Sequence, residues 1–189
     1  MAFTRPIGGD FEITVEPTLI PSQILIAHVD RAMNAVSVSG DFVGHTLYYG
    51  QGAGSFPTAS AVASDIMDII RLSSHRKGNF ERDTEQSVEK SLLMVSGRVI
   101  ARADIISGHY LRLKVRDEPD VSAKITSTFA EYDVKIDRFF QDGNSDDSIS
   151  LVLLTGECAL KNINQSLERL GQLKSLKEQP VVLRVETEA

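Results

Sequence analysis

The chain has 189 residues, a net charge of −6 and one cysteine, Cys158. Its 42% hydrophobic and 24% charged residues are ordinary for a globular protein of one large domain or two small ones. The acidic balance argues against a nucleic-acid partner, and a single cysteine excludes an internal disulfide framework. With no secretory signal at residues 1–9 and no apolar run of about 18 residues, we expect a cytoplasmic protein that does not enter membranes.

The first third of the chain reads as short strands followed by one long helix. Apolar residues alternate with polar ones over residues 11–16, which is the period of a half-buried strand. Residues 24–29 are apolar but short, and are compatible with a strand or with buried coil. A second strand is predicted at 34–39, with a turn at Gly40-Asp41 and a third strand around 45–49.

A glycine-rich loop at residues 50–54 then opens into a helix over 57–72. Gly50, Gly52 and Gly54 permit positive φ and close backbone approach, and Pro57 suits a first helical position. A glycine loop that feeds a helix N-terminus favours an anion or cofactor contact, because free N–H groups point at the ligand. The spacing matches neither the dinucleotide fingerprint nor a P-loop, so tight packing of strand and helix is an equally open interpretation.

The middle of the chain contains few candidate functional residues. Residues 73–89 are polar and mixed in charge, and predict an exposed linker, while 92–106 resumes apolar character and suggests one more strand. The histidines are scattered without metal-ligand spacing, so we predict no metal site. Cys158 has no base nearby in the sequence and is interpreted as a packing residue.

The last part of the chain predicts a βαββαβ order, the ferredoxin-like split unit. Leu111, Leu113 and Val115 form one apolar side of a strand, and Val121, Ile125 and Phe129 form a helical stripe. The remaining elements are a strand at 134–139, a polar hairpin loop at 142–147, a strand at 149–154, a helix with stripe residues between 160 and 170, and a strand at 181–185.

The sequence motifs of the first segment resemble those of homoserine dehydrogenase. The resemblance rests on Pro17-Thr18-Leu19-Ile20-Pro21, Asn34-Ala35-Val36, Gly40-Asp41-Phe42-Val43-Gly44, Tyr49-Gly50-x-Gly52-Ala53-Gly54 and Pro57-Thr58-Ala59-Ser60-Ala61-Val62. It implies that the segment finishes a substrate-binding and dimerisation sheet and then returns to the dinucleotide domain. By that resemblance Gly54 is the best candidate for a cofactor contact, with Gly52 and Thr58 beside it.

The same resemblance implies that the catalytic machinery lies elsewhere. The family places its dinucleotide fingerprint, catalytic lysine and acidic substrate ligands upstream of this segment. We therefore assign no catalytic residue here and expect that the chain alone is not a working dehydrogenase. NAD(P) is the cofactor of the intact family enzyme, and we expect no tight binding of it to this chain alone.

The last segment resembles an ACT domain, a small-molecule sensing module of amino-acid metabolism. The resemblance rests on Tyr110-Leu111-Arg112-Leu113-x-Val115-x-Asp117-x-Pro119-x-Val121 and Ala123-Lys124-Ile125. It implies feedback inhibition by L-threonine, with Asp117, Asp120 and Val121 as candidate regulatory-ligand residues. The predicted architecture is a partial α/β substrate-binding region at 1–72, a linker at 73–105 and a ferredoxin-like ACT domain at 106–189.

Asp120 departs from the family pattern, which usually has glycine there. An aspartate at a helix start is well suited to accept hydrogen bonds from the free N–H groups. Its carboxylate would also repel a ligand carboxylate. We therefore expect Asp120 to cap the helix and to weaken or abolish threonine binding.

Two functional interpretations follow from the sequence. The first is a C-terminal portion of an NAD(P)-dependent homoserine dehydrogenase with its ACT regulatory domain. The second is a stand-alone amino-acid-sensing or assembly module that keeps a remnant of the catalytic region. In both, the apolar stripe of the 57–72 helix lacks a dinucleotide domain to pack against, which predicts a homo-oligomer, with a dimer as the expected form.

Overall fold

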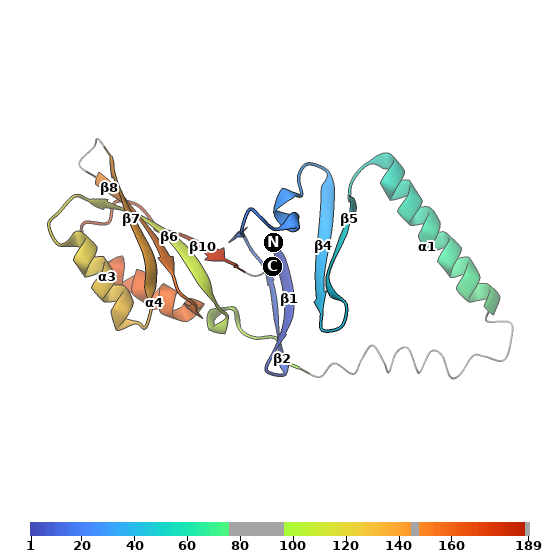
Figure 1. The fold of residues 1–189 in the computed structure, drawn as a ribbon, viewed down its shortest axis with the longest axis horizontal. Helices are drawn as coiled ribbons and strands as arrows, with labels where there is room; N and C mark the ends of the chain where they lie inside the picture. Colours follow the sequence, from blue (N-terminus) through green and yellow to red (C-terminus); the bar gives the residue numbers. More distant parts are fainter. Residues whose placement is uncertain (76–96, 145–147, 188–189) are drawn as a thin grey trace. The chain divides into compact units, whose positions relative to one another are not determined.

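The computed structural model describes residues 1–75, 97–144 and 148–187 (Figure 1). The chain forms two compact units. One contains Met1–Pro21 together with Gly97–Glu188, and the other contains Ser22–Ser96. The first 21 residues thus belong with the C-terminal half of the chain.

The first unit is built on an antiparallel sheet with two helices on one face (Figure 1). Its main elements in chain order are β6 (Ile106–Arg116), α3 (Val121–Glu131), β7 (Ile136–Asn144), β8 (Ser148–Thr155), α4 (Leu160–Leu170) and β10 (Val181–Val185). The strands lie in the order β10-β6-β8-β7 and each pair is antiparallel. A short strand, β9 (Cys158–Ala159), pairs with the beginning of β6. The ferredoxin-like βαββαβ order predicted from the sequence is confirmed.

The core lies between this sheet and its two helices. The alternation in β6 places Leu111, Leu113 and Val115 in the core, where they are at most 1% exposed. The same core takes the predicted helical stripe of α3 together with residues of β8 and α4: Val121, Ile125, Phe129, Ile149, Leu151, Leu153, Ile163 and Leu170. Because burial of each large apolar side chain contributes roughly 1.5–3 kcal/mol, this layer is the main source of the unit's stability.

Three predicted boundaries between residues 73 and 147 need correction. Asp142 and Gly143 are not in a loop, because β7 continues through Asn144 and pairs with β8; residues 145–147 lie outside the described part. Residues 97–105 form an isolated bridge at Val99 and a 3₁₀ helix, η2 (Arg102–Asp104), and not a strand. The expected linker at 73–89 begins inside a helix that runs to His75, and its other residues lie outside the described part.

A β-hairpin from the N-terminus belongs to the same unit. It consists of β1 (Ala2–Ile7) and β2 (Asp10–Val15), joined by Gly8 and Gly9 at φ of 58° and 92°. Two positive φ values suit a two-residue hairpin turn that follows the twist of the strands. The next strand, β3 (Thr18–Leu19), pairs in parallel with β10 and so attaches the hairpin to the edge of the sheet.

The strand predicted at residues 11–16 is present, but its buried side is the polar one. Glu12 is 1% exposed and Thr14 is 9% exposed, whereas Ile13 and Val15 are exposed. The alternation correctly predicted the period of the strand. It did not predict which side is covered, because the covering group is a buried arginine of β10 and not an apolar layer.

The second unit contains a hairpin and a long helix (Figure 1). Its elements are η1 (Leu25–His28), β4 (Met33–Gly40), β5 (Gly44–Gln51) and α1 (Ser55–His75). Both predicted strands and the helix are confirmed, and the segment left open at 24–29 is a 3₁₀ helix. Apart from half-buried Pro57, the residues of α1 from Ser55 to Arg71 are exposed. Among the described residues, no helix combines the length and apolar character needed to cross a membrane.

Candidate functional site

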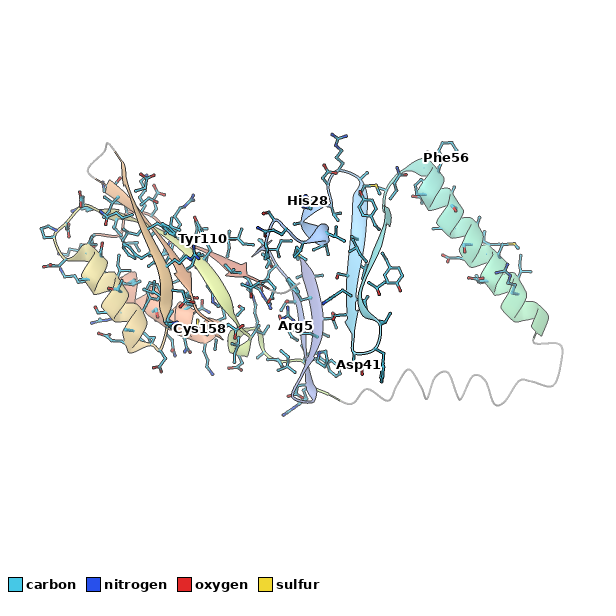
Figure 2. All side chains as sticks on the ribbon, in the orientation of Figure 1. Arg5, His28, Asp41, Phe56, Tyr110 and Cys158 are labelled. Carbon is cyan, nitrogen blue, oxygen red and sulfur yellow. The ribbon has the colours of Figure 1, made fainter. Side chains whose placement is uncertain are left out.

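The glycine loop and the start of α1 bring the three predicted cofactor residues together. Gly52 donates its N–H to the carbonyl of Ala32 at 3.2 Å, which holds the loop against the chain segment that enters β4. Gly54 has a φ of +126°, and its carbonyl accepts the N–H of Thr58 at 3.1 Å in the first turn of α1. Gly52, Gly54 and Thr58 are therefore neighbours on one exposed loop and helix start (Figure 2 labels Phe56 in the same turn).

Two glycines of this loop have physical reasons to be glycine. A Cβ on Gly52 would lie 1.5 Å from Nδ2 of Asn34, so that side chain would have to move. The positive φ of Gly54 strains any residue with a side chain. Gly50, by contrast, has open space around it and no positive φ. The contact with Asn34 is thus a packing reason for Gly52. At Gly54 the reason is the positive φ, and a Cβ there would meet only Pro57, at 3.3 Å from its Cδ.

The three candidate regulatory residues lie at the start of α3 but differ in accessibility. Asp117 and Asp120 are exposed, whereas the side chain of Val121 is 3% exposed and belongs to the core. The N–H of Val121 already donates to the carbonyl of Glu118 at 3.3 Å. Only the two aspartates could therefore present side chains to a ligand.

The expectation that Asp120 caps α3 with its carboxylate is wrong. Asp120 occupies the N-cap position, yet its side chain makes no capping hydrogen bond. Its backbone is left-handed, with a φ of 69° and a ψ of 0°, in place of the extended conformation usual for an N-cap. This conformation is the physical reason that a glycine suits the position.

A buried cluster of charges, which the sequence did not reveal, joins the N-terminal hairpin to β10. Arg184 is 3% exposed as a side chain and forms ion pairs with Glu12, Glu16 and Glu186. It also donates to Oγ1 of Thr14 at 3.3 Å. Because an unpaired buried charge is very costly, these acceptors are what allow a guanidinium to sit inside the unit.

The cluster extends to the surface through two further arginines. Arg5 reaches Glu186 at 2.7 Å and Glu12 at 3.4 Å, and Arg102 reaches Glu16 at 3.0 Å. Phe3 lies between two of these cations, with its ring centroid 5.2 Å from the Cζ of Arg5 and 4.8 Å from that of Arg184. Figure 2 shows Arg5 on the hairpin strand. The hairpin is thus fixed by charge and ring contacts.

A cavity of about 200 Å³ adjoins this cluster. Its lining comes from the segment after β2, from η2, from the beginnings of β6 and α4, and from β10. The residues are Glu16, Pro17, Arg102, Ile105, Ser107, His109, Leu160, Asn164, Val182, Leu183 and Arg184. All of them belong to the first unit. Neither the glycine loop nor the start of α3 contributes to the cavity.

His109 and Cys158 form a buried pair beside this cavity. The Sγ of Cys158 lies 3.7 Å from Nδ1 of His109. Burial lowers the pKa of His109, an effect that Arg184 reinforces and the charge of Glu16 opposes. Burial likewise raises the pKa of the Cys158 thiol, against a hydrogen bond with Thr155 that lowers it. A protonated, buried thiol is a packing group and a poor nucleophile, as the sequence predicted.

One signal in the sequence pointed to the charge cluster. Arg184 interrupts an otherwise apolar final strand, and Glu12, Thr14 and Glu16 occupy alternate positions of the second strand of the hairpin. No local pattern shows that these two segments meet. Among the residues that the structure describes, no group of three histidine, cysteine or acidic side chains could hold a metal ion.

The comparisons with known proteins cover nearly the whole chain. The family model for homoserine dehydrogenase matches residues 2–67. Homoserine dehydrogenase of Neisseria gonorrhoeae is 36% identical over 192 residues, which span 99% of this chain and 42% of that protein. The chain belongs to the homoserine dehydrogenase family. Homoserine dehydrogenase of Pseudomonas aeruginosa is 35% identical over 98% of the chain and 43% of its own length.

The fold agrees with a solved member of the family. The crystal structure of homoserine dehydrogenase from Thiobacillus denitrificans superposes with a TM-score of 0.81 at 35% identity, over 97% of this chain and 41% of that one. The Staphylococcus aureus enzyme, at 21% identity and a TM-score of 0.53, shares the fold. The chain spans about two fifths of the length of these homoserine dehydrogenases.

Proposed function

We propose that this chain is the C-terminal portion of an NAD(P)-dependent homoserine dehydrogenase, which converts homoserine to aspartate semialdehyde in threonine and methionine biosynthesis. Residues 1–72 would complete its catalytic region and residues 106–189 would form its ACT domain, joined by a linker at 73–105. The observation that carries this proposal is the continuous match of 98–99% of the chain to homoserine dehydrogenases. A stand-alone sensor is not favoured, because both segments match the same enzymes in one alignment.

Within that enzyme, the glycine loop would contact the nicotinamide cofactor. The exposed loop at Gly52 and Gly54 presents the N-terminal end of the α1 dipole without a bulky side chain, and this fits a phosphate of the cofactor. The N–H groups of Gly52 and Thr58 are already donated to the carbonyls of Ala32 and Gly54, so these residues would support the loop conformation. The bound nicotinamide would accept a hydride from the substrate. This chain would contribute binding and orientation of the cofactor, since we assign it no proton-transfer group.

A chimera tests this proposal. The chain replaces the aligned segment of the Neisseria gonorrhoeae enzyme, and homoserine oxidation is followed by the appearance of NADH or NADPH. We expect an active chimera, and we expect the Gly54→Ala variant to raise KM for the cofactor by about tenfold, because the positive φ is strained and the loop shifts.

Gly50→Ala is the matched control, because it adds the same methyl group to the same loop in open space without a positive φ. It should leave KM for the cofactor unchanged. A folded chimera without activity would contradict the proposed function. Equal effects of the two alanine variants would contradict the proposed role of Gly54.

The ACT domain would regulate or assemble the enzyme. The proposed effector is L-threonine near Asp117 and Asp120, and the carboxylate of Asp120 would weaken its binding. The Asp120→Gly variant should then bind threonine more tightly in a calorimetric titration, and no gain in affinity would contradict this role. We further propose a cytoplasmic homo-oligomer, formed through the β4–β5 hairpin, the ACT domain or both.

A further inference from the structure

The N-terminal hairpin of β1 and β2 presents two chemically different faces, because successive side chains of a strand point to opposite sides. On β2 the side chains of Glu12 and Thr14 lie on one face, where both accept hydrogen bonds from Arg184. Ile13 and Val15 lie on the other face and are 52% and 83% exposed. The polar face of the hairpin is therefore the covered one, and its apolar side chains remain exposed.

The exposed face is apolar across three neighbouring segments. Residues directly opposite one another in an antiparallel pair share a face, so the register of β1 adds further members to it. On the other edge of β2, Val99 forms a parallel bridge with Phe11 and is exposed. We call this surface the apolar hairpin face; it consists of Ala2, Thr4, Pro6, Phe11, Ile13, Val15 and Val99. None of these side chains is charged.

The hairpin belongs to one body by sequence and to another by structure. The family model for homoserine dehydrogenase includes it, since the match covers residues 2–67. In the structure, however, the hairpin is part of the same unit as Gly97–Glu188. The chain spans 42% of the Neisseria gonorrhoeae enzyme, so more than half of that protein has no counterpart here. A sheet in a globular domain buries its apolar face against another layer, and the described residues leave this face exposed.

We infer that the apolar hairpin face is the docking surface for the part of homoserine dehydrogenase that this chain does not contain. This inference rests on the proposed function. The partner is an apolar surface of the catalytic region, because the buried centre of a protein interface is depleted of charges and this face has none. With its polar face held by Arg184 and its apolar face held by the catalytic region, the hairpin connects that region to the ferredoxin-like unit.

Thiol labelling compares this face in two proteins. Val15→Cys introduces an accessible thiol, since the native Cys158 is buried. The substitution is made in the isolated chain and in the chimera with the Neisseria gonorrhoeae enzyme, and labelling of the new thiol by iodoacetamide is followed by peptide mass spectrometry. We expect labelling to be slower in the chimera by at least about tenfold, because docking leaves the thiol accessible only through local opening. Labelling of the isolated chain should be fast and independent of protein concentration.

A charge placed on the face provides a second test. Ile13→Asp should lower the thermal unfolding midpoint of the chimera more than that of the isolated chain, because only the chimera buries the new carboxylate. Phe140→Asp is the matched control: Phe140 is 53% exposed on β7, the strand at the end of the sheet, so it carries the same cost of an aspartate in a strand. Its effect should be equal in the two proteins. An equal effect of Ile13→Asp in both would contradict docking at this face.

Three labelling results would overturn the inference. Equal rates in the isolated chain and in an active chimera would show that the face stays in solvent, while the proposed function stands. Slow labelling of the isolated chain that depends on its concentration would assign the face to a second copy. Slow labelling of the isolated chain at every concentration would assign it to the chain's own second unit. A folded chimera that is inactive but protects the thiol would contradict the proposed function and support the docking surface.

Discussion

The buried charges around Arg184 determine how the N-terminal hairpin is held. Glu12 is 1% exposed and its partner Arg184 is 3% exposed, so neither has much water to stabilise its charge. Burial opposes the charge of Arg184, but hydrogen bonds and charges from Glu12 and Glu186 raise its pKa. Each charge of the pair therefore depends on the other. Removing one partner would leave the other charge buried without compensation, at a large cost in folding free energy.

Removing one partner should be strongly destabilising. We expect Glu12→Ala to lower the free energy of unfolding by about 3–5 kcal/mol, because it leaves Arg184 buried with fewer acceptors. Urea unfolding followed by circular dichroism measures the change. The control is Glu178→Ala, which removes an exposed ion pair with Lys114 and should have little effect. Similar small losses in both variants would contradict the importance of the buried pair.

His109 should make stability depend on pH. Burial lowers its pKa below the ordinary value of 6.5, so the unfolded chain binds a proton that the folded chain does not. The free energy of unfolding should therefore fall as the pH drops below about 6.5. Replacing this residue with glutamine should reduce the change in the urea unfolding midpoint between pH 7.5 and 5.5. An unchanged slope in His109→Gln would show that other groups cause the dependence.

At the scale of elements, the start of α3 shows a local conflict between residue type and backbone. Asp120 has a φ of 69° and gains no capping hydrogen bond in return. The apolar stripe behind it is nevertheless buried, with Val121 and Ile125 in the core. Packing of the helix therefore outweighs the strain of one left-handed residue, which is of order 1–2 kcal/mol for a residue with a Cβ.

Relieving that strain should stabilise the domain. We expect Asp120→Gly to raise the free energy of unfolding by about 0.5–1 kcal/mol, since glycine adopts positive φ without a Cβ clash. Ala123→Gly provides a control of opposite sign, because it places glycine inside the same helix and should cost about 1 kcal/mol. Thermal or urea unfolding distinguishes the two. A loss of stability in Asp120→Gly would refute the strain argument.

At the scale of the whole molecule, α1 presents an apolar stripe that the described residues leave exposed. Val62 and Ile66 of this stripe are 53% and 52% exposed. Exposed apolar surface of this extent favours contact with another protein surface. In the proposed enzyme that surface would be the dinucleotide domain, and in this chain alone it would be a second copy.

Self-association of the isolated chain should follow. We expect an oligomer in light scattering at micromolar concentration, and Ile66→Glu should weaken the association because it places a charge in the stripe. Ser64→Glu adds the same charge on the polar side of the helix and should leave association unchanged. A monomer at that concentration would contradict the proposed oligomer.

The sequence by itself determined the elements whose pattern is local. The alternation in 111–115 and the stripe at Val121, Ile125 and Phe129 correctly predicted β6 and α3 with their buried sides, since spacing along one element shows which residues share a face. The glycine loop and helix of the second unit were found in the same way. These local patterns also carried the family resemblance that the comparisons confirmed.

Only the tertiary structure decided what covers each face. Arg184 and Glu12 are 172 positions apart, so no periodicity in either segment could show that they pair. For the same reason the polar side of β2 is the buried one, and the cavity lined by Arg184 was absent from every sequence prediction. The left-handed backbone of Asp120 was likewise visible only in the structure. Local chemistry specifies the elements of this chain, and the partner that each surface meets depends on residues distant in sequence.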